Sequence, residues 1–297
     1  MIKHIAFNKI IVSTLCLSLF LMFTFLPSKN EIKHETIISE VSSESNYVFL
    51  LDEDNYVSRV SVFYDSDGVL DNIRKRIEYL KNGRDYFYPL MNKNTKINKL
   101  YVDKDNVFID FSKEFLDVNM YLEEEMIESL VYSLSEINGI NKIYINVEGE
   151  EFRRLPHSGK EINYPLDRSI GINKEYNVSS LLDINYTTVF FSKSVNDYEY
   201  MVPVTKVSNT SASKIDIIIS ELKSSVNTSS MLDGLIHEDA RVVSSNIMDD
   251  KMEIIFDGEL IEETCYLISA SVFENYEVNE VVFLNEKDEK FNIIHKK

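Results

Sequence analysis

The sequence repeats itself, and this repeat is the feature that most limits how the chain can fold. Glu124-Glu125 opens a stretch with apolar residues at helical spacing, which is followed by a strand-like segment at 142–147. Glu262-Glu263 opens a second such stretch, followed by a strand-like segment at 280–284, and the offset between the two is a constant 138 residues. A self-similarity of this length predicts two copies of one folding unit.

Each copy has the same predicted order of elements: a pair of strands, a helix, a hairpin, a second helix and a final strand. In the first copy these are 47–51 and 56–64, a helix over 69–80 between a cap at Asp67 and a stop at Gly83, the hairpin 100–111, a helix over 124–138 closed by Gly139, and 142–147. In the second copy they are 188–191 and 198–207, a helix over 215–222 after Ser211, the hairpin 241–256, a helix over 262–276, and 280–284. Each helix has a single apolar stripe and needs a sheet to cover it. The sequence therefore predicts an α+β fold: two tandem copies of a small antiparallel or mixed sheet with two helices on one face.

The N-terminal residues have a different character from the rest of the chain. Lys3 and Lys9 precede an uncharged apolar run over residues 10–26, which Pro27 ends. A basic flank before an apolar run keeps the N-terminus inside and sends the rest across the membrane. We favour an uncleaved signal anchor, which predicts a single-pass protein of the cell membrane with its domains on the extracytoplasmic side. A cleaved secretion signal is one alternative. A lipoprotein modified at Cys16 is another, although Leu15 stands where lipid attachment needs a small residue.

These patterns divide the chain into four parts. Residues 1–27 are the signal anchor, and residues 28–45 are a polar spacer without a sustained period. Residues 46–172 hold the first copy with its linker, and residues 173–297 hold the second copy.

The charge of the chain excludes some partners. The formal net charge is −18, which argues against binding nucleic acid, whose phosphates need Lys and Arg, and against docking on an anionic lipid surface. The two cysteines, Cys16 and Cys265, read as apolar thiols and cannot build a metal cluster.

Side chains with catalytic chemistry do not converge in the sequence, so we expect no catalytic residue, no cofactor site and no metal site. His157, in the segment between the copies, is the histidine of most interest, but none of the five histidines has metal-ligand spacing. Residues 65–68 and 103–106 resemble fragments of calcium loops and read better as turns, because Arg76 stands where the first would need a glutamate. The acidic run 123–125 reads as the first turn of a helix. Residues 86–88 (Tyr-Phe-Tyr) either form an exposed contact patch or fold down over the sheet edge, and we favour the second.

Three segments resemble one known family. Residues 107–115, which include Asp110 and Ser112, resemble a strand motif of the GerM-type sporulation and spore-germination proteins, which carry two tandem GerMN domains. The helix after residue 124 with the strand that leads to Gly149 resembles the closing segment of that domain. Residues 165–173, with Arg168, Gly171 and Asn173, resemble the linker between its two copies. The second copy departs from the motif, with Ile255-Phe256-Asp257-Gly258 at the matching place.

This resemblance implies a non-catalytic, membrane-tethered scaffold for sporulation and spore germination, similar in fold to ring-building modules. It implies that the partners are other membrane-anchored sporulation proteins or further copies of the chain. It also implies that the chain can be part of a ring or channel complex between mother cell and forespore. A cell-wall-binding or ligand-binding regulatory ectodomain, with its ligand in the cleft between the copies, is the alternative. A hydrolase or its remnant ranks last because no nucleophile–base pair is apparent.

Overall fold

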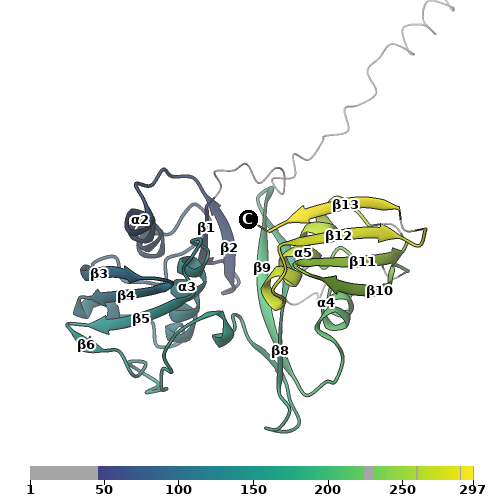
Figure 1. Ribbon diagram of the computed structural model, residues 1–297. Helices are drawn as coiled ribbons and strands as arrows, with labels where there is room; N and C mark the ends of the chain where they lie inside the picture. Colours follow the sequence, from purple (N-terminus) through teal and green to yellow (C-terminus); the bar gives the residue numbers. More distant parts are fainter. Residues whose placement is uncertain (1–45, 224–230, 238, 259, 288, 297) are drawn as a thin grey trace, which may run out of the picture. The chain divides into compact units, whose positions relative to one another are not determined.

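The two predicted copies appear in the structure as two four-stranded sheets, each with two helices over one face (Figure 1). The computed structural model describes residues 46–223, 231–237, 239–258, 260–287 and 289–296. All of these belong to one compact unit. The predicted anchor at 10–26 and spacer at 28–45 lie outside the described residues.

The first copy is built on a mixed sheet. Its strands have the order β3-β4-β5-β6, with β4 and β5 parallel and the outer pairs antiparallel. They are β3 (Ile97–Asp103), β4 (Asn106–Phe111), β5 (Lys142–Val147) and β6 (Glu150–Glu151), and the helices are α2 (Val69–Asn82) and α3 (Glu123–Ser135). A short 3-10 helix over Lys113–Leu116 follows β4.

The second copy repeats this plan. Its order is β10-β11-β12-β13, again with a parallel central pair. The elements are β10 (Arg241–Met248), β11 (Lys251–Asp257), β12 (Glu280–Asn285), β13 (Lys290–His295), α4 (Lys214–Lys223) and α5 (Glu262–Asn275). The fold class predicted from the sequence is confirmed.

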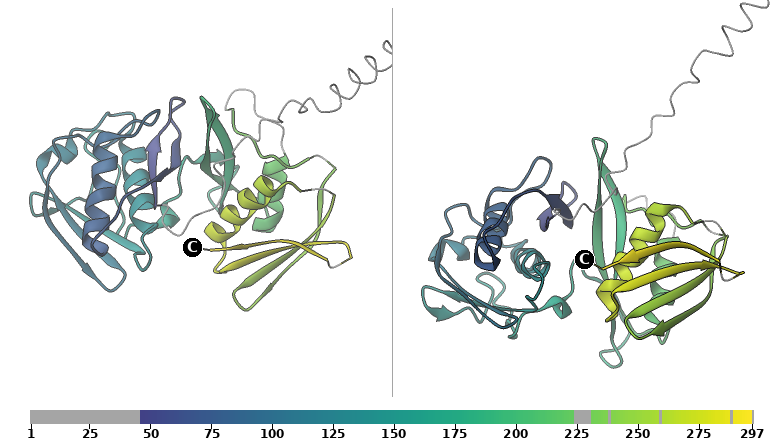
Figure 2. Two further views of the ribbon diagram at one scale, coloured as in Figure 1. Left: turned by 90° about the horizontal axis from the view of Figure 1, so that it is seen from above. Right: turned by 45° about the horizontal axis from the view of Figure 1, so that its top comes forward.

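The strand pairs at the front of each copy form a separate layer, which the sequence pattern did not reveal. They join in one five-stranded sheet of β1 (Asn46–Leu51), β2 (Val57–Val62), β7 (Glu175–Asn177), β8 (Asn185–Val195) and β9 (Tyr198–Ser208). Strands β2 and β9, from different copies, meet antiparallel at Arg59 and Met201. The helices therefore have β-structure on both sides: α3 contacts β1 and β5, and α5 contacts β8 and β12 (Figure 2).

In each copy a serine side chain of the second helix hydrogen-bonds the unpaired edge of a strand, β1 or β8. The Phe49 N–H at the edge of β1 donates to Ser133 Oγ of α3 over 2.8 Å. In the second copy the Phe190 N–H of β8 donates to Ser271 Oγ of α5 over 2.9 Å. A buried strand edge needs partners for its N–H groups. A small hydroxyl side chain supplies one and lets the helix approach closely.

The apolar stripes of the helices are buried as predicted, except at the start of α2, where Val69 and Leu70 are each 42% exposed. Met126, Leu130 and Leu134 of α3 and Leu267 of α5 are at most 1% exposed. Cys265 on α5 is also buried, and burial raises the pKa of its thiol to about 11. That fits the prediction of an apolar thiol for Cys265, whereas Cys16 lies outside the described residues.

Several predicted boundaries are wrong. The cap of α2 is Gly68 rather than Asp67, and the side chain that caps α4 is Ser213, which accepts from the Asp216 N–H, rather than Ser211. Helix α3 ends at Ser135, three residues before the predicted end. Strand β13 was missed altogether. Residues 290–293 alternate between polar and apolar side chains, but the apolar Phe291 and Ile293 are 45% and 41% exposed. The segment therefore lacks the strong apolar run of a central strand.

The Tyr-Phe-Tyr segment at 86–88 was predicted to fold down over the sheet edge, and it does so in part. Leu51 and Tyr88 exchange backbone hydrogen bonds of 2.8 and 3.2 Å, so this segment covers the edge of β1. Phe87 is 4% exposed and packs edge-on against Tyr200, while Tyr86 and Tyr88 are about half exposed.

Among the described residues, no helix has both the length and the apolarity to cross a membrane.

Candidate functional site at the junction of the two copies

One arginine from the linker joins the two copies. Arg168 Nη2 donates to Glu136 Oε1, just after α3, over 2.6 Å, and its Nη1 donates to Glu274 of α5. Its guanidinium carbon lies 4.8 Å from the Tyr132 ring centroid, and Nε donates to Ser135 Oγ over 2.8 Å. A guanidinium presents its donors in a fixed fork, which suits a cation shared between two carboxylates.

The charges around Glu136 hold it ionised. Burial opposes the charged form, but Arg59 and Arg168 outweigh burial and lower the pKa of Glu136 to about 2. Arg59 Nη2 donates to Glu136 Oε2 over 3.1 Å, so both carboxylate oxygens have a cationic partner. Burial also disfavours the charged form of Arg168, while Glu274 and Glu136 raise its pKa.

A second buried ion pair crosses the junction. Lys193 Nζ of β8 donates to Asp52 Oδ2 over 2.8 Å, and these side chains are 2% and 1% exposed. Lys193 also donates to Asp54, and the hydroxyls of Tyr200 and Ser58 donate to Asp52. Burial disfavours the ammonium of Lys193, but the hydrogen bonds to Asp52 and Asp54 outweigh this and raise its pKa. The pair is stable only with these partners, because either charge alone would be buried without compensation.

An asparagine bridges the place where β2 and β9 meet. Asn173 Oδ1 accepts from the Val57 N–H over 2.9 Å, and its Nδ2 donates to the carbonyls of Val57 and Pro203. Proline has no N–H for a strand ladder, and the amide side chain fills the gap in the pairing. Asn173 has φ 46, a left-handed conformation that asparagine tolerates.

Gly171, two residues before Asn173, lets the linker backbone lie close against Lys174 and Thr205. Its φ is 72, and an added Cβ would lie 3.2 Å from the side chains of Lys174 and Thr205. Next to it, the Ile172 N–H donates to Thr205 Oγ1 over 2.9 Å, and the Thr205 N–H donates back to the Ile172 carbonyl. The linker is therefore fastened to β9 by reciprocal hydrogen bonds between residues 172 and 205.

The linker is also fastened along α3. Glu123 accepts from the N–H groups of His157 and Ser158 over 2.9 and 2.8 Å, and Glu124 pairs with Lys160. One turn on, Glu128 accepts from the Asn173 N–H over 2.9 Å and pairs with Lys174, and the Tyr132 hydroxyl donates to the Arg168 carbonyl. The carboxylates at the start of α3, predicted only to suit the helix dipole, hold the linker in place. His157 belongs to this fastening: its N–H reaches Glu123 and its ring contacts the Val118 carbonyl.

Comparisons with known proteins agree on one family. Residues 47–152 match the family Germane, described as "Sporulation and spore germination". The chain is 30% identical over 205 residues to the spore germination protein GerM of Bacillus subtilis, an overlap of 67% of this chain and 55% of that protein. It therefore spans little more than half the length of this curated relative.

The solved structure of the tandem GerMN domains of the sporulation protein GerM from Bacillus subtilis has the same fold, with a TM-score of 0.75 and 24% identity. That match covers 85% of this chain and 96% of the solved one, both copies included. The chain belongs to the GerM-type family. The family resemblance seen in the sequence, with its two tandem domains, is confirmed.

The signature residues of this GerM-type chain fall into two groups. Arg168, Gly171 and Asn173 lie together at the junction. Asp110 and Gly149 lie at the end of the first sheet, where the Gly149 N–H donates to Asp110 Oδ1 over 2.8 Å and shapes the turn from β5 to β6. Ser112 is buried nearby, and its Oγ accepts from the Lys96 N–H over 3.0 Å.

Sequence reasoning missed most charged residues of the junction. Asp52, Lys193, Glu136 and Glu274 were not singled out. One signal was available: the 138-residue offset that aligns the second helices also aligns Glu136 with Glu274. When two diverged copies keep a carboxylate at the same position, the two carboxylates are expected to have the same role.

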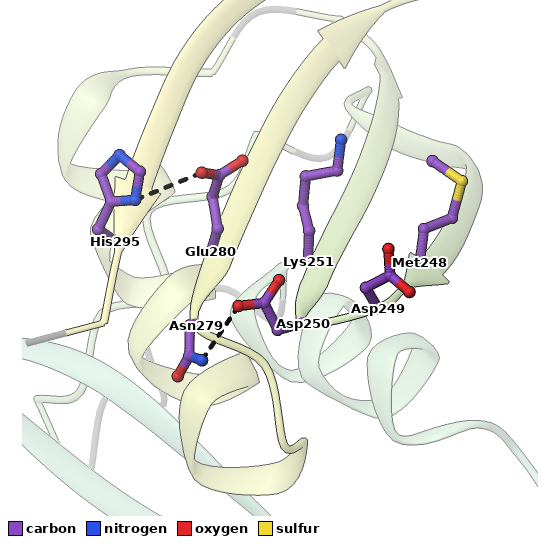
Figure 3. A pocket seen from close by; sticks show the side chains of 7 residues that line it. All are labelled: Met248, Asp249, Asp250, Lys251, Asn279, Glu280 and His295. Carbon is purple, nitrogen blue, oxygen red and sulfur yellow. Dashed lines mark hydrogen bonds and ion pairs between the residues drawn. The ribbon is translucent and has the colours of Figure 1, made fainter.

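A cavity of about 360 Å³ lies away from the junction, at the turn between β10 and β11 (Figure 3). Its lining is mostly polar, and five of the seven lining side chains are already paired: Asn279 with Asp250 at 3.2 Å, His295 with Glu280 at 3.4 Å, and Lys251 with Glu253 at 2.6 Å. The described residues contain no group of three or more His, Cys, Asp or Glu side chains placed to hold a metal ion.

Proposed function

We propose that this GerM-type chain is a non-catalytic, membrane-tethered scaffold of bacterial sporulation and spore germination, with its two domains on the extracytoplasmic side of the cell membrane. The role in sporulation and germination draws on the relatives, which are named for it. The tether draws on the basic flank and apolar run at 10–26. Its partners would be other membrane-anchored sporulation proteins or further copies of itself, and a ring or channel complex between mother cell and forespore is the assembly that we propose.

The fastened linker is the observation that carries the scaffold role. A chain that only presented two independent domains would need a flexible connection. Here residues 157–174 are held along α3 and against β9, and Arg168 reaches the second copy. The tandem can therefore present surfaces from both copies in one fixed relation, which an assembly of repeated subunits requires.

The electrostatics of the junction favour structure over catalysis. A general acid or base works best with a pKa near the operating pH. Glu136 and Arg168 show the opposite, because the carboxylate and the guanidinium stabilise each other's charged forms and the pKa of Glu136 falls to about 2. Buried charged groups that are paired across two surfaces resist separation, because parting them would leave each charge buried without compensation.

Deletion and complementation in a spore-forming host that carries the gene test this function. We expect loss of the gene to lower the yield of heat-resistant spores or their germination, and the full chain to restore it. Replacement of residues 1–27 by a cleavable secretion signal should not restore it, because the tether would be lost. Normal sporulation and germination without the gene would refute the proposal.

Co-purification separates the scaffold from its alternative. The full chain, extracted from sporulating cells in mild detergent, should retain other membrane-anchored sporulation proteins or itself. Retention by purified cell wall alone would favour a wall-binding ectodomain instead.

A further inference from the structure

One end of the five-stranded sheet carries an exposed apolar loop. Residues 178–184, here called the leucine loop, connect β7 to β8. Leu181 and Leu182 at its tip are 88% and 75% exposed. Side chains of this size with so little cover are uncommon as neighbours on a soluble surface, and they mark a contact site when they occur together.

The loop is held in one conformation. Asn209 Oδ1 accepts from the N–H groups of Ser179 and Ser180 over 2.8 and 3.1 Å. Asn209 Nδ2 donates to the carbonyls of Ser180 and Leu182 over 3.1 and 2.7 Å, and the Leu182 N–H donates to Ser180 Oγ. A loop that is already ordered loses little conformational entropy when it binds, so exposed leucines on it are suited to docking.

Two tyrosines form the base of this surface. Tyr176 of β7 and Tyr186 of β8 are both paired with Val207 of β9, one on each side. Residues directly opposite in adjacent strands share a face of the sheet, so the two rings flank Val207. They are 64% and 47% exposed. Tyrosine buries a large area with few rotatable bonds, which is why it is enriched where proteins bind each other.

Strand registers place this surface far from the end of the sheet at which β1 starts. Asn46 of β1 pairs with Val62, at the end of the sheet where β8 and β9 turn into each other. The leucine loop precedes Asn185, which pairs with Ser208 at the other end of β9. With a rise of about 3.3 Å per residue, the two ends lie about 30 Å apart. The surface therefore faces away from the point where the described part of the chain begins.

Charge decides between the candidate occupants. Asp183 follows Leu182 directly, and its carboxylate would have to enter hydrocarbon if the leucines inserted into a lipid bilayer. The net charge of −18 repels anionic lipid, and a second copy that bound through the same loop would set one Asp183 carboxylate against another. A protein with an apolar pocket and a basic rim satisfies both the leucines and the aspartate.

We propose that the leucine loop, with Tyr176 and Tyr186 at its base, is the docking surface for a partner protein that offers an apolar pocket rimmed by Lys or Arg. This inference deepens the proposed function, on which it rests in taking the partner to be a protein of the same assembly.

Site-specific photo-crosslinking in sporulating cells tests it. The probe is benzoylphenylalanine in place of Leu182 in the full chain, with the same probe in place of Leu70, a 42% exposed residue of α2, as the control. We expect one predominant adduct from position 182 and none from position 70. The partner segment crosslinked at position 182 should be apolar, with Lys or Arg next to it. Adding Leu181→Asn or Asp183→Lys should reduce that adduct at least fivefold. An adduct with the chain itself, with lipid only, the absence of any adduct, or indifference to both substitutions would overturn the proposal.

A complementation experiment keeps this inference separate from the proposed function. In a strain that lacks the gene, the full chain with both Leu181→Asn and Leu182→Asn should accumulate to the wild-type level and fail to restore spore formation or germination. Full restoration by this variant overturns the docking surface alone. A deletion strain without any defect overturns the proposed function, whereas crosslinking still reports on the surface.

Discussion

Glu136 and Glu274 occupy the same position in the two copies, 138 residues apart, and both accept hydrogen bonds from the single guanidinium of Arg168. The second ion pair follows the same rule. Phe49 and Phe190, which meet the matching serines of α3 and α5, lie 141 residues apart in the first strands of the copies. Asp52 and Lys193 are related by the same offset, and they bind each other. The junction is therefore built from matching residues of the repeat, with the linker between them.

Removing the shared cation should destabilise both copies. Arg168→Ala leaves Glu136 and Glu274 buried without this partner, so we expect the free energy of unfolding to fall by about 3–5 kcal/mol. Urea denaturation followed by circular dichroism measures the change. Arg153→Ala is the matched control, because Arg153 is 76% exposed and paired only with Glu151, and it should change the value by less than about 0.5 kcal/mol. Equal effects of the two substitutions would show that Arg168 is not a structural centre.

Loss of the amide at position 173 should open the joint between β2 and β9. Asn173→Gly keeps a residue that tolerates φ 46 but removes the bonds to Val57 and Pro203. We expect a loss of about 1–3 kcal/mol and faster hydrogen exchange at the Val57 amide, with little change at Phe111 in the sheet core. Unchanged exchange at Val57 would contradict the bridging role.

The serine contacts at the strand edges should have similar weight in both copies. Ser133→Ala and Ser271→Ala each leave a buried N–H, of Phe49 or Phe190, without its partner. Each should lower stability by about 1–3 kcal/mol. Ser220→Ala on the exposed face of α4 is the control and should be nearly neutral. A neutral result for either buried serine would mean that its strand edge finds another partner.

Acid should weaken the junction in a defined window. The pKa of Glu136 falls from its ordinary 4.5 to about 2 on folding. Since the folded value is the lower one, this carboxylate stabilises the fold above about pH 4.5, and the stabilisation is lost as the pH falls toward 2. The loss amounts to roughly 3 kcal/mol. In Glu136→Gln, which is less stable at neutral pH, the slope of stability against pH in this window should be smaller than in the wild type. Parallel curves for the two proteins would contradict the assignment.

The sequence revealed the elements that carry strong periodic patterns and missed the relations between them. Leu130 and Leu134 recur at helical spacing, and Ile109 and Phe111 alternate along β4, so α3 and the first sheet were predictable. Strands β1 and β8 were also found, but their placement in a sheet of their own depends on Ser133 and Ser271, which look like ordinary polar residues of a helix. A short-range pattern does not say which strand edge a helix will meet.

The junction was predictable in part for a similar reason. Arg168, Gly171 and Asn173 came from the family resemblance, whereas Asp52 and Lys193 lie 141 residues apart and belong to no local motif. An ion pair across so long a stretch appears only when the fold brings its ends together.

A distance measurement between the copies tests the fixed junction most directly. Nitroxide labels at Glu78→Cys on α2 and Lys290→Cys on β13, with Cys16 replaced by serine and Cys265 left in its buried position, report the distribution of distances by double electron–electron resonance. A fastened linker predicts one narrow distribution in the wild type that broadens in Arg168→Ala. A broad or multiple distribution in the wild type, unchanged by Arg168→Ala, would show that the two copies move independently.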